Sequence, residues 1–216
     1  MRSGVKIRVL LADDHAVVRY GLRALLEVSG MEVVGEAGDG RSALRIAEDC
    51  QPDVAILDVA MPELNGIDAA AMLRERCPNT RIVILSMHAD AEHVHRAFAA
   101  GASGYLLKGS ASDEIVAAAR AVVGGGRYLS RELAHTDPAR AGRSGEPGPL
   151  ESLSARERQV LQLVVEGHSS AEIAAVVNLS PKSVDTYRSR LMKKLGVSDI
   201  PALVKFAVQH GLTPAE

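Results

Sequence analysis

The first 125 or so residues repeat one pattern, in which a short apolar run is followed by a longer segment with helical periodicity. Three runs, residues 7–12 (IRVLLA), 54–57 (VAIL) and 81–85 (RIVIL), are nearly continuous rather than alternating. Such runs are typical of parallel strands that helices cover on both faces. Shorter runs at 32–35 and 104–107 fit outer strands. The pattern therefore predicts a doubly wound (βα)5 α/β domain with right-handed crossovers.

Helical periodicity continues beyond this domain, but the apolar runs do not. A segment rich in Pro, Gly, Ser and Arg separates the two parts, and a segment of this kind cannot bury enough surface to fold. We therefore predict a domain over residues 1–127, a flexible linker over 128–149, and a small four-helix domain over 150–216. The expected helices cover residues 17–29, 41–50, 67–76, 91–100 and 113–123 in the first domain, and 159–166, 170–177, 181–195 and 200–210 in the second.

Composition excludes several classes of protein. Hydrophobic residues make up 47% of the chain and charged residues 24%, which is ordinary for a globular protein and excludes wholesale disorder. No apolar run approaches the ~18 residues that span a bilayer, so we expect a cytoplasmic protein without a membrane partner. The two cysteines, Cys50 and Cys77, lack metal-binding or redox spacing.

Polar residues follow four of the five predicted strands. Asp13 and Asp14 follow the first, Asp58 the third, Ser86 the fourth and Lys108 the fifth. Because the carboxyl ends of parallel strands meet at one edge of a doubly wound sheet, these side chains should surround a single crevice. Crowded carboxylates repel one another unless a cation lies between them, and Mg²⁺ is the most plausible hard divalent ion.

Three of these residues suggest phosphoryl transfer. We expect the Asp58 carboxylate, ionised at neutral pH, to take a phosphoryl group as an acyl phosphate. Lys108 would then hold the new phosphoryl oxygens, and the Ser86 hydroxyl would donate to another. The alternatives are structural: an aspartate can cap the following helix, a serine can form a turn, and a lysine can simply be solvated.

The first domain resembles the receiver domain of two-component response regulators, from about residue 7 to 123. The matching segments, in this order, are 11–15 (LADDH), 57–62 (LDVAMP) with Asn65-Gly66, 84–88 (ILSMH) and 101–108 (GASGYLLK). The resemblance implies that Asp58 is the phosphoacceptor. It also implies that Asp13, Asp14 and the Ala60 carbonyl, together with Asp58, bind Mg²⁺.

The same resemblance assigns a switch. Ser86 and Lys108 would contact the phosphoryl group, and Tyr105 would change rotamer together with Ser86. Simple packing stays an alternative for Tyr105, since a tyrosine on an outer strand is often part of the core.

The second domain contains two predicted helices, at 170–177 and 181–195, joined by the turn Asn178-Leu179-Ser180. This arrangement is typical of a helix-turn-helix motif, whose second helix enters the major groove. The basic residues of that second helix are Lys182, Arg188, Arg190, Lys193 and Lys194. A solvated basic helix is the alternative from spacing alone.

Residues 153–212 resemble the LuxR-type DNA-binding domain, so the whole chain resembles the NarL/FixJ response regulators. The resemblance places Asp185, Thr186 and Ser189 toward the bases, and the basic residues, Lys182 and Arg188 among them, against phosphates. It also makes the last helix a dimer helix, although that helix could instead complete the core. Its expected contact residues are Leu203, Val204 and Ala207.

We therefore predict a homodimeric transcriptional regulator of promoter DNA, switched by a histidine kinase that phosphorylates Asp58 with Mg²⁺. It would not be an enzyme beyond its own phosphoryl transfer and dephosphorylation. A phosphorylation-independent regulator with a vestigial receiver is the main alternative. An aspartyl-phosphate phosphatase is another, but such an enzyme usually has a second carboxylate two residues beyond the nucleophile, where this chain has Ala60.

Overall fold

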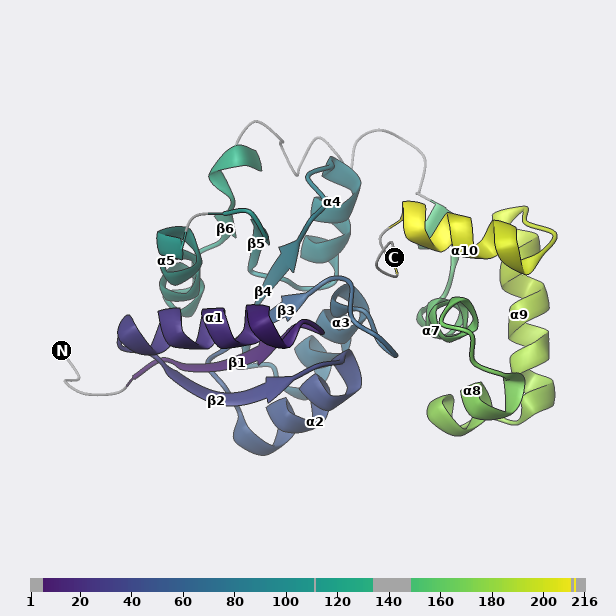
Figure 1. The fold of residues 1–216 in the computed structure, drawn as a ribbon, viewed down its shortest axis with the longest axis horizontal. Coiled ribbons are helices and arrows are strands. Elements are labelled where there is room, and N and C mark those ends of the chain that lie inside the picture. The colour runs from purple at the N-terminus through teal and green to yellow at the C-terminus, as the bar shows by residue number, and fades with distance from the viewer. Residues whose placement is uncertain (1–5, 111, 134–148, 211, 213–216) are drawn as a thin grey trace.

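The N-terminal domain is built on a six-stranded sheet of parallel strands in the order β2-β1-β3-β4-β5-β6 (Figure 1). The computed structural model describes residues 6–110, 112–133, 149–210 and 212. The strands are β1 Arg8–Ala12, β2 Glu32–Ala37, β3 Val54–Asp58, β4 Arg81–Ser86, β5 Gly104–Leu107 and β6 Tyr128–Leu129. The predicted doubly wound α/β fold is confirmed.

Helices cover both faces of the sheet because successive strand residues point to opposite sides. In β1, Leu10 packs with α2 and α3, whereas its neighbours Val9 and Leu11 pack with α1 and α5. This is why the central strands are apolar without alternation. The helices are α1 Ala16–Val28, α2 Gly40–Cys50, α3 Gly66–Arg76, α4 Ala91–Ala99 and α5 Ser112–Val123.

The predicted start of the linker at residue 128 is wrong. Tyr128 donates its backbone N–H to the Ser103 carbonyl at 3.0 Å, and Ser130 donates to that of Tyr105 at 2.9 Å. The 3₁₀ turn η1 Arg131–Leu133 follows and buries Leu133 in the core. A strand of two residues after three glycines has no periodicity, so the sequence did not reveal it. The rest of the expected linker, 134–148, lies outside the described residues.

The C-terminal domain is helical around its own core. Ser154 and Glu157 form a capping box at the start of α7, each side chain accepting the other's backbone N–H. Gly196 ends α9 in the left-handed region with φ 67°. The elements are η2 Pro149–Ser152, α7 Ala155–Val165, α8 Ser170–Val177, α9 Pro181–Leu195 and α10 Ile200–Gln209.

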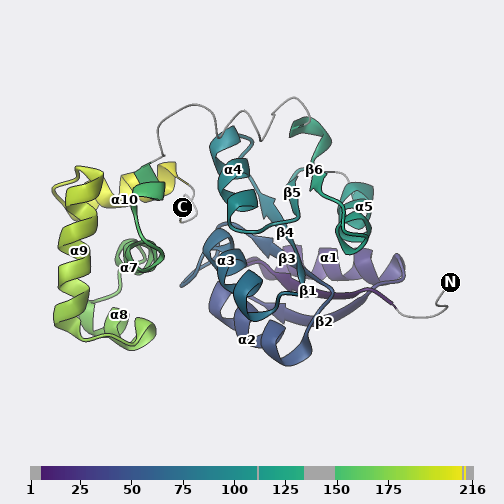
Figure 2. The ribbon, with the colours of Figure 1, turned by 180° about the vertical axis from the view of Figure 1, so that it is seen from behind.

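The two domains are docked against each other. Helices α7 and α10 lie on the side of the C-terminal domain that faces the receiver fold, next to α3 and α4 (Figures 1 and 2). Helix α9 lies on the far side of its domain. Within the described ranges, no helix combines the length and apolar character needed to cross a bilayer.

Candidate functional site

The polar residues predicted at the strand ends converge at one edge of the sheet. Asp58 is the last residue of β3, Asp13 follows β1 and Lys108 follows β5. The Lys108 Nζ lies 2.9 Å from Oδ2 of Asp13 and 2.8 Å from Oδ2 of Asp58. Both carboxylates are almost completely buried. One ammonium group therefore bridges two buried carboxylates that lie 45 residues apart in the sequence.

Burial and the neighbouring opposite charges shift the pKa values of Asp58 and Lys108 in opposite directions. Burial raises the pKa of Asp58, although the Lys108 ammonium and the backbone N–H of Ala60 partly offset it. Burial acts to lower the pKa of Lys108, but the carboxylates of Asp58 and Asp13 outweigh it, so this pKa is raised. Lys108 is therefore charged at neutral pH and can stabilise an anion beside Asp58.

The acidic residues fit a divalent metal ion. Asp13, Asp14, His15 and Asp58 each offer one ligand atom, and these atoms lie within 4.8 Å of one another. Oδ2 of Asp13 and Oδ2 of Asp58 both have Lys108 as their ion-pair partner. Clustered carboxylate oxygens are suitable ligands for a hard cation. Sequence analysis missed His15, whose Nδ1 lies 2.6 Å from Asp14.

Ser86 and Tyr105 both contact the backbone of His88, at the start of the loop after β4. The Ser86 Oγ accepts the His88 N–H at 3.0 Å, and the Tyr105 hydroxyl donates to the His88 carbonyl at 2.8 Å. Tyr105 is fully buried, and burial raises its pKa far above the ordinary value. The two residues expected to switch together are thus linked through one loop residue.

The start of α3 lies directly against the end of β3. A Cβ atom on Gly66 would collide with the Asp58 carbonyl oxygen, so only glycine allows this approach. Asn65 caps the helix by accepting the Asp68 N–H at 2.9 Å. The loop after β3 is therefore held at a fixed distance from Asp58.

Helix α7 of the C-terminal domain binds this same loop. The fully buried Gln162 donates to the Met61 carbonyl at 2.7 Å and accepts the Asn65 N–H at 2.8 Å. Glu166 accepts the Glu63 N–H at 3.0 Å. A buried glutamine on a helix looks like an ordinary polar surface residue in the sequence, so sequence reasoning missed this contact.

A second interdomain contact joins α3 to the start of α7. The Arg158 guanidinium donates to Asp68 through Nε at 2.8 Å, and its Nη2 lies 2.7 Å from the same carboxylate oxygen. Asp68 is almost fully buried, which limits screening of this ion pair by water.

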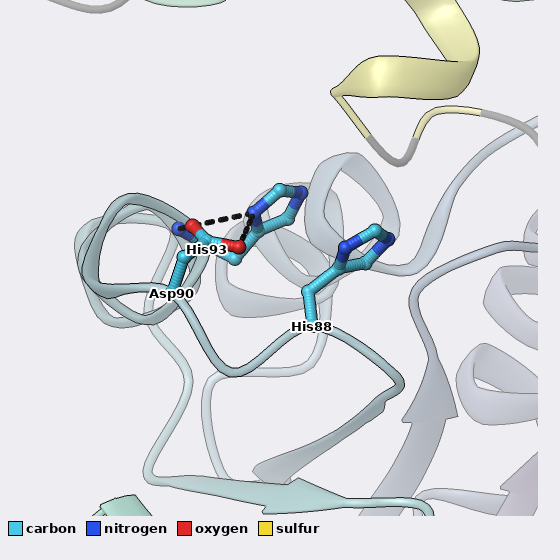
Figure 3. A group of neighbouring side chains, drawn as sticks. All are labelled: His88, Asp90 and His93. Carbon is cyan, nitrogen blue, oxygen red and sulfur yellow. Dashed lines mark hydrogen bonds and ion pairs between the residues drawn. The ribbon is translucent and has the colours of Figure 1, made fainter.

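Helix α10 contacts the receiver at the start of α4. Nδ1 of His93 lies 2.8 Å from the Asp90 carboxylate, and its Nε2 lies 3.1 Å from the carbonyl oxygen of His210, the residue that ends α10. Figure 3 shows the His93 ring beside Asp90, with the His88 ring next to it. The two rings are stacked, with centroids 4.2 Å apart and planes within 6°. Through the contact between His93 and His210, this cluster lies at the boundary between the two domains.

The predicted recognition helix, α9, presents most of its predicted DNA-contact side chains to solvent. Lys182, Thr186 and Ser189 are exposed, as are Arg190 and Lys193, whereas Arg188 is half-buried. Asp185 is exposed too, but it accepts a 2.7 Å hydrogen bond from Ser170 of α8.

Lys194 has an intramolecular role. Its Nζ lies 2.7 Å from Glu157 and donates to the Ser152 carbonyl at 3.1 Å, so it holds the start of α7. This position makes it a poor candidate for the phosphate contact predicted from the sequence.

Two of the three predicted dimer residues lie in the core. Leu203 and Ala207 are fully buried among the helices of their own domain, and Val204 is half-buried. The apolar stripe of α10 completes the fold, which was the alternative interpretation, so Leu203 and Ala207 offer no surface to a second copy.

Comparisons with known proteins agree with this geometry. Residues 9–120 match the response regulator receiver domain, and residues 151–207 match the bacterial regulatory proteins of the luxR family. The chain belongs to the LuxR-family response regulators. Its receiver therefore offers an acidic pocket for a divalent metal, and its C-terminal domain is a DNA-binding domain of a transcriptional regulator.

This response regulator resembles full-length relatives along almost its whole length. It is 40% identical to the transcriptional regulatory protein MctR of Rhizobium johnstonii over 213 residues, covering 98% of both chains. It is 37% identical to the response regulator UvrY of Escherichia coli over 217 residues, covering 97% of each. RcsB of Salmonella enterica serovar Typhimurium, solved bound to a promoter in the presence of phosphomimetic BeF₃⁻, matches with TM-score 0.66 and 27% identity, covering 95% of this chain and 100% of RcsB.

Proposed function

We propose that a histidine kinase phosphorylates this response regulator on Asp58 in an Mg²⁺-dependent reaction, and that the phosphorylated form binds promoter DNA as a homodimer. The observation that carries the proposal is the position of Lys108, within 3 Å of both Asp13 and Asp58. An uncharged or distant residue there would suit a vestigial receiver. We also place the protein in the cytoplasm, where chromosomal DNA is accessible.

Each residue of the site has a role in the proposed transfer. Asp58 is the nucleophile, and Lys108 and Ser86 bind the transferred phosphoryl oxygens. Asp13, Asp14, Asp58 and the Ala60 carbonyl would hold Mg²⁺, which offsets repulsion between the anionic donor and acceptor. Beyond this transfer and the loss of its own phosphoryl group, we propose no enzymatic activity.

Phosphorylation would act on the loops that hold the C-terminal domain. The phosphoryl group adds about −1.5 to −2 charges and three acceptor oxygens beside Ser86. Ser86 and Tyr105 share His88, whose ring stacks on His93, and His93 contacts the end of α10. A change at Ser86 is therefore transmitted to a domain contact through two residues.

Released from the receiver, the C-terminal domain would read DNA with α9. We assign base contacts to Asp185, Thr186 and Ser189, and phosphate contacts to four basic residues of the helix. Dimers would bind half-sites about one helical turn apart. Those phosphate-contact residues are Lys182, Arg188, Arg190 and Lys193.

The test is labelling with acetyl phosphate and Mg²⁺, comparing the wild type with Asp58→Asn, followed by DNA binding and oligomeric state. We expect label only with Asp58 and Mg²⁺, and tighter DNA binding or dimerisation of the labelled form. Folded wild type that takes no label would contradict the phosphoacceptor assignment and favour the vestigial receiver. Release of phosphate over many turnovers would favour the phosphatase.

A further inference from the structure

The phosphoacceptor lies at one side of a cavity that the C-terminal domain helps to enclose. The cavity has a volume of about 550 Å³. One part of its wall contains Asp58, Ser86 and Lys108, the groups assigned to the phosphoryl group. Another part is apolar and includes Val18 of α1 and, from the other domain, Val208 of α10. A residue of the DNA-binding domain thus lines the site of phosphoryl transfer.

Contacts on two sides hold the C-terminal domain over this site. Gln162 and Glu166 of α7 bind backbone groups of the loop after β3, within eight residues of Asp58. At the other side, the carbonyl of His210 lies 3.1 Å from His93. The loops that follow β3 and β4 are therefore both covered by the same domain (Figure 2).

We propose that the docked C-terminal domain selects the phosphodonor by size. In this arrangement Asp58 accepts phosphoryl from a small donor of the acyl phosphate or phosphoramidate class. A phosphohistidine carried on a protein reaches Asp58 only after α7 and α10 leave the receiver. This inference rests on the proposed function of Asp58 and adds to it which donors each domain arrangement accepts.

The dimensions support this selection. A helix with its side chains is roughly 10–12 Å across, and α7 and α10 already occupy positions against the loops after β3 and β4 that such a helix would have to approach. A protein helix bearing phosphohistidine therefore meets the docked C-terminal domain before it reaches Asp58. Acetyl phosphate, only slightly larger than phosphate itself, can enter with its phosphoryl end at Lys108 and its methyl group toward Val18 and Val208.

The chemistry with either donor balances without a further reactant. A carboxylate oxygen of Asp58 attacks phosphorus and forms the new P–O bond. With an acyl phosphate, the bond from phosphorus to the acyl oxygen breaks, and a carboxylate leaves with the electron pair. With phosphohistidine, the P–N bond breaks, and the departing imidazole takes a proton from water. The donors thus differ chiefly in the bulk attached to the leaving group.

The experiment compares the same imidazole leaving group on a single amino acid and on a protein domain. Full-length protein is incubated with Mg²⁺ and either free phosphohistidine or a histidine-phosphotransfer domain phosphorylated by phosphoramidate, and initial rates of labelling are measured. Two variants weaken docking through different contacts, Gln162→Ala and Glu166→Ala. The matched control is Gln159→Ala, which lies on the same helix and whose side chain contacts the Met72 sulfur across the interface at 3.7 Å.

We expect both docking variants to raise the labelling rate from the phosphotransfer domain by about tenfold or more, as an increased open fraction requires. The rate from free phosphohistidine should change by less than about twofold, and Gln159→Ala should resemble the wild type with both donors. Equal gains with both donors, or no gain with the phosphotransfer domain, would overturn the size selection while leaving the phosphoacceptor intact. No label from free phosphohistidine in any folded variant would overturn the proposed function itself.

Discussion

The amide oxygen of Gln162 accepts the backbone N–H of Asn65 at 2.8 Å, joining the DNA-binding domain to the helix cap that follows Asp58. The Asn65 Nδ2 also donates to this oxygen at 3.3 Å, while the Gln162 amide nitrogen donates to Met61. Because Gln162 is fully buried, these groups have no water to replace a lost partner. The contact therefore couples the position of α7 to the conformation of the loop after Asp58.

Gln162→Ala should shift the protein from the docked to the open arrangement. The substitution leaves the Met61 carbonyl and the Asn65 N–H without partners while docked, at a cost of about 1–3 kcal/mol for each buried group. Small-angle X-ray scattering should then show a larger radius of gyration at unchanged helix content. Gln159→Ala should leave the scattering curve unchanged, and equal curves for the wild type and Gln162→Ala would contradict this prediction.

Lys108→Gln should slow phosphorylation of Asp58 by acetyl phosphate by about 10²-fold, as expected for removal of one group that stabilises developing charge. The substitution also leaves Asp13 and Asp58 without the ammonium between them. Stopped-flow or radiolabelling rates at saturating Mg²⁺ measure the effect. Lys182→Gln, on the far side of the C-terminal domain, should react like the wild type. A rate for Lys108→Gln within twofold of the wild type would remove Lys108 from the transfer step.

Asp58→Asn should stabilise the metal-free protein at neutral pH. The pKa of Asp58 is raised in the folded state by burial, so the ionised form is the less favourable one in the native site. The ionised carboxylate destabilises the folded state above the raised pKa. This destabilisation disappears as the pH falls through that pKa, because Asp58 becomes protonated. The melting temperature of Asp58→Asn should therefore exceed that of the wild type at pH 7 and approach it in mild acid.

Asp113→Asn provides the control for this titration. Asp113 is exposed and its ion pair with Arg131 is 3.5 Å long, so its replacement should change stability by less than about 1 kcal/mol. A melting temperature of Asp58→Asn below that of the wild type at pH 7 would contradict the expected stabilisation.

Lys193→Ala and Lys194→Ala should affect different properties although the residues are neighbours. Lys193 is exposed on α9, so its loss should weaken DNA binding and reduce the slope of log K against log salt by about 0.9. Lys194 contacts Glu157, so its loss should lower thermal stability and leave most of the salt slope intact. Fluorescence anisotropy at several salt concentrations, with melting curves, distinguishes the two. Identical salt slopes for both variants would contradict the assignment.

Much of the fold could be predicted because its signals are local. The central strands are apolar on both faces, and the capping box at Ser154 and the glycine at 196 mark helix ends within a few residues. The acidic site was also predictable, since Asp13, Asp58 and Lys108 each follow an apolar run and parallel strands bring such positions together.

Other features depend on contacts far apart in the chain. β6 at Tyr128 is too short for periodicity, and its existence depends on pairing with β5. Leu203 and Ala207 form an apolar stripe that suits either a dimer or a core, and only packing decides between them. The partners of Gln162 lie about 100 residues away, in backbone groups that carry no sequence signal.

Helix α7 recognises main-chain atoms of the loop after Asp58, namely the Met61 carbonyl and the N–H groups of Glu63 and Asn65. These hydrogen bonds depend on the path of the main chain, so inserting a single residue displaces the acceptor and both donors together. When chimaeras are assembled from receivers and DNA-binding domains of different origin, matching the length of this loop should preserve coupling better than matching its sequence.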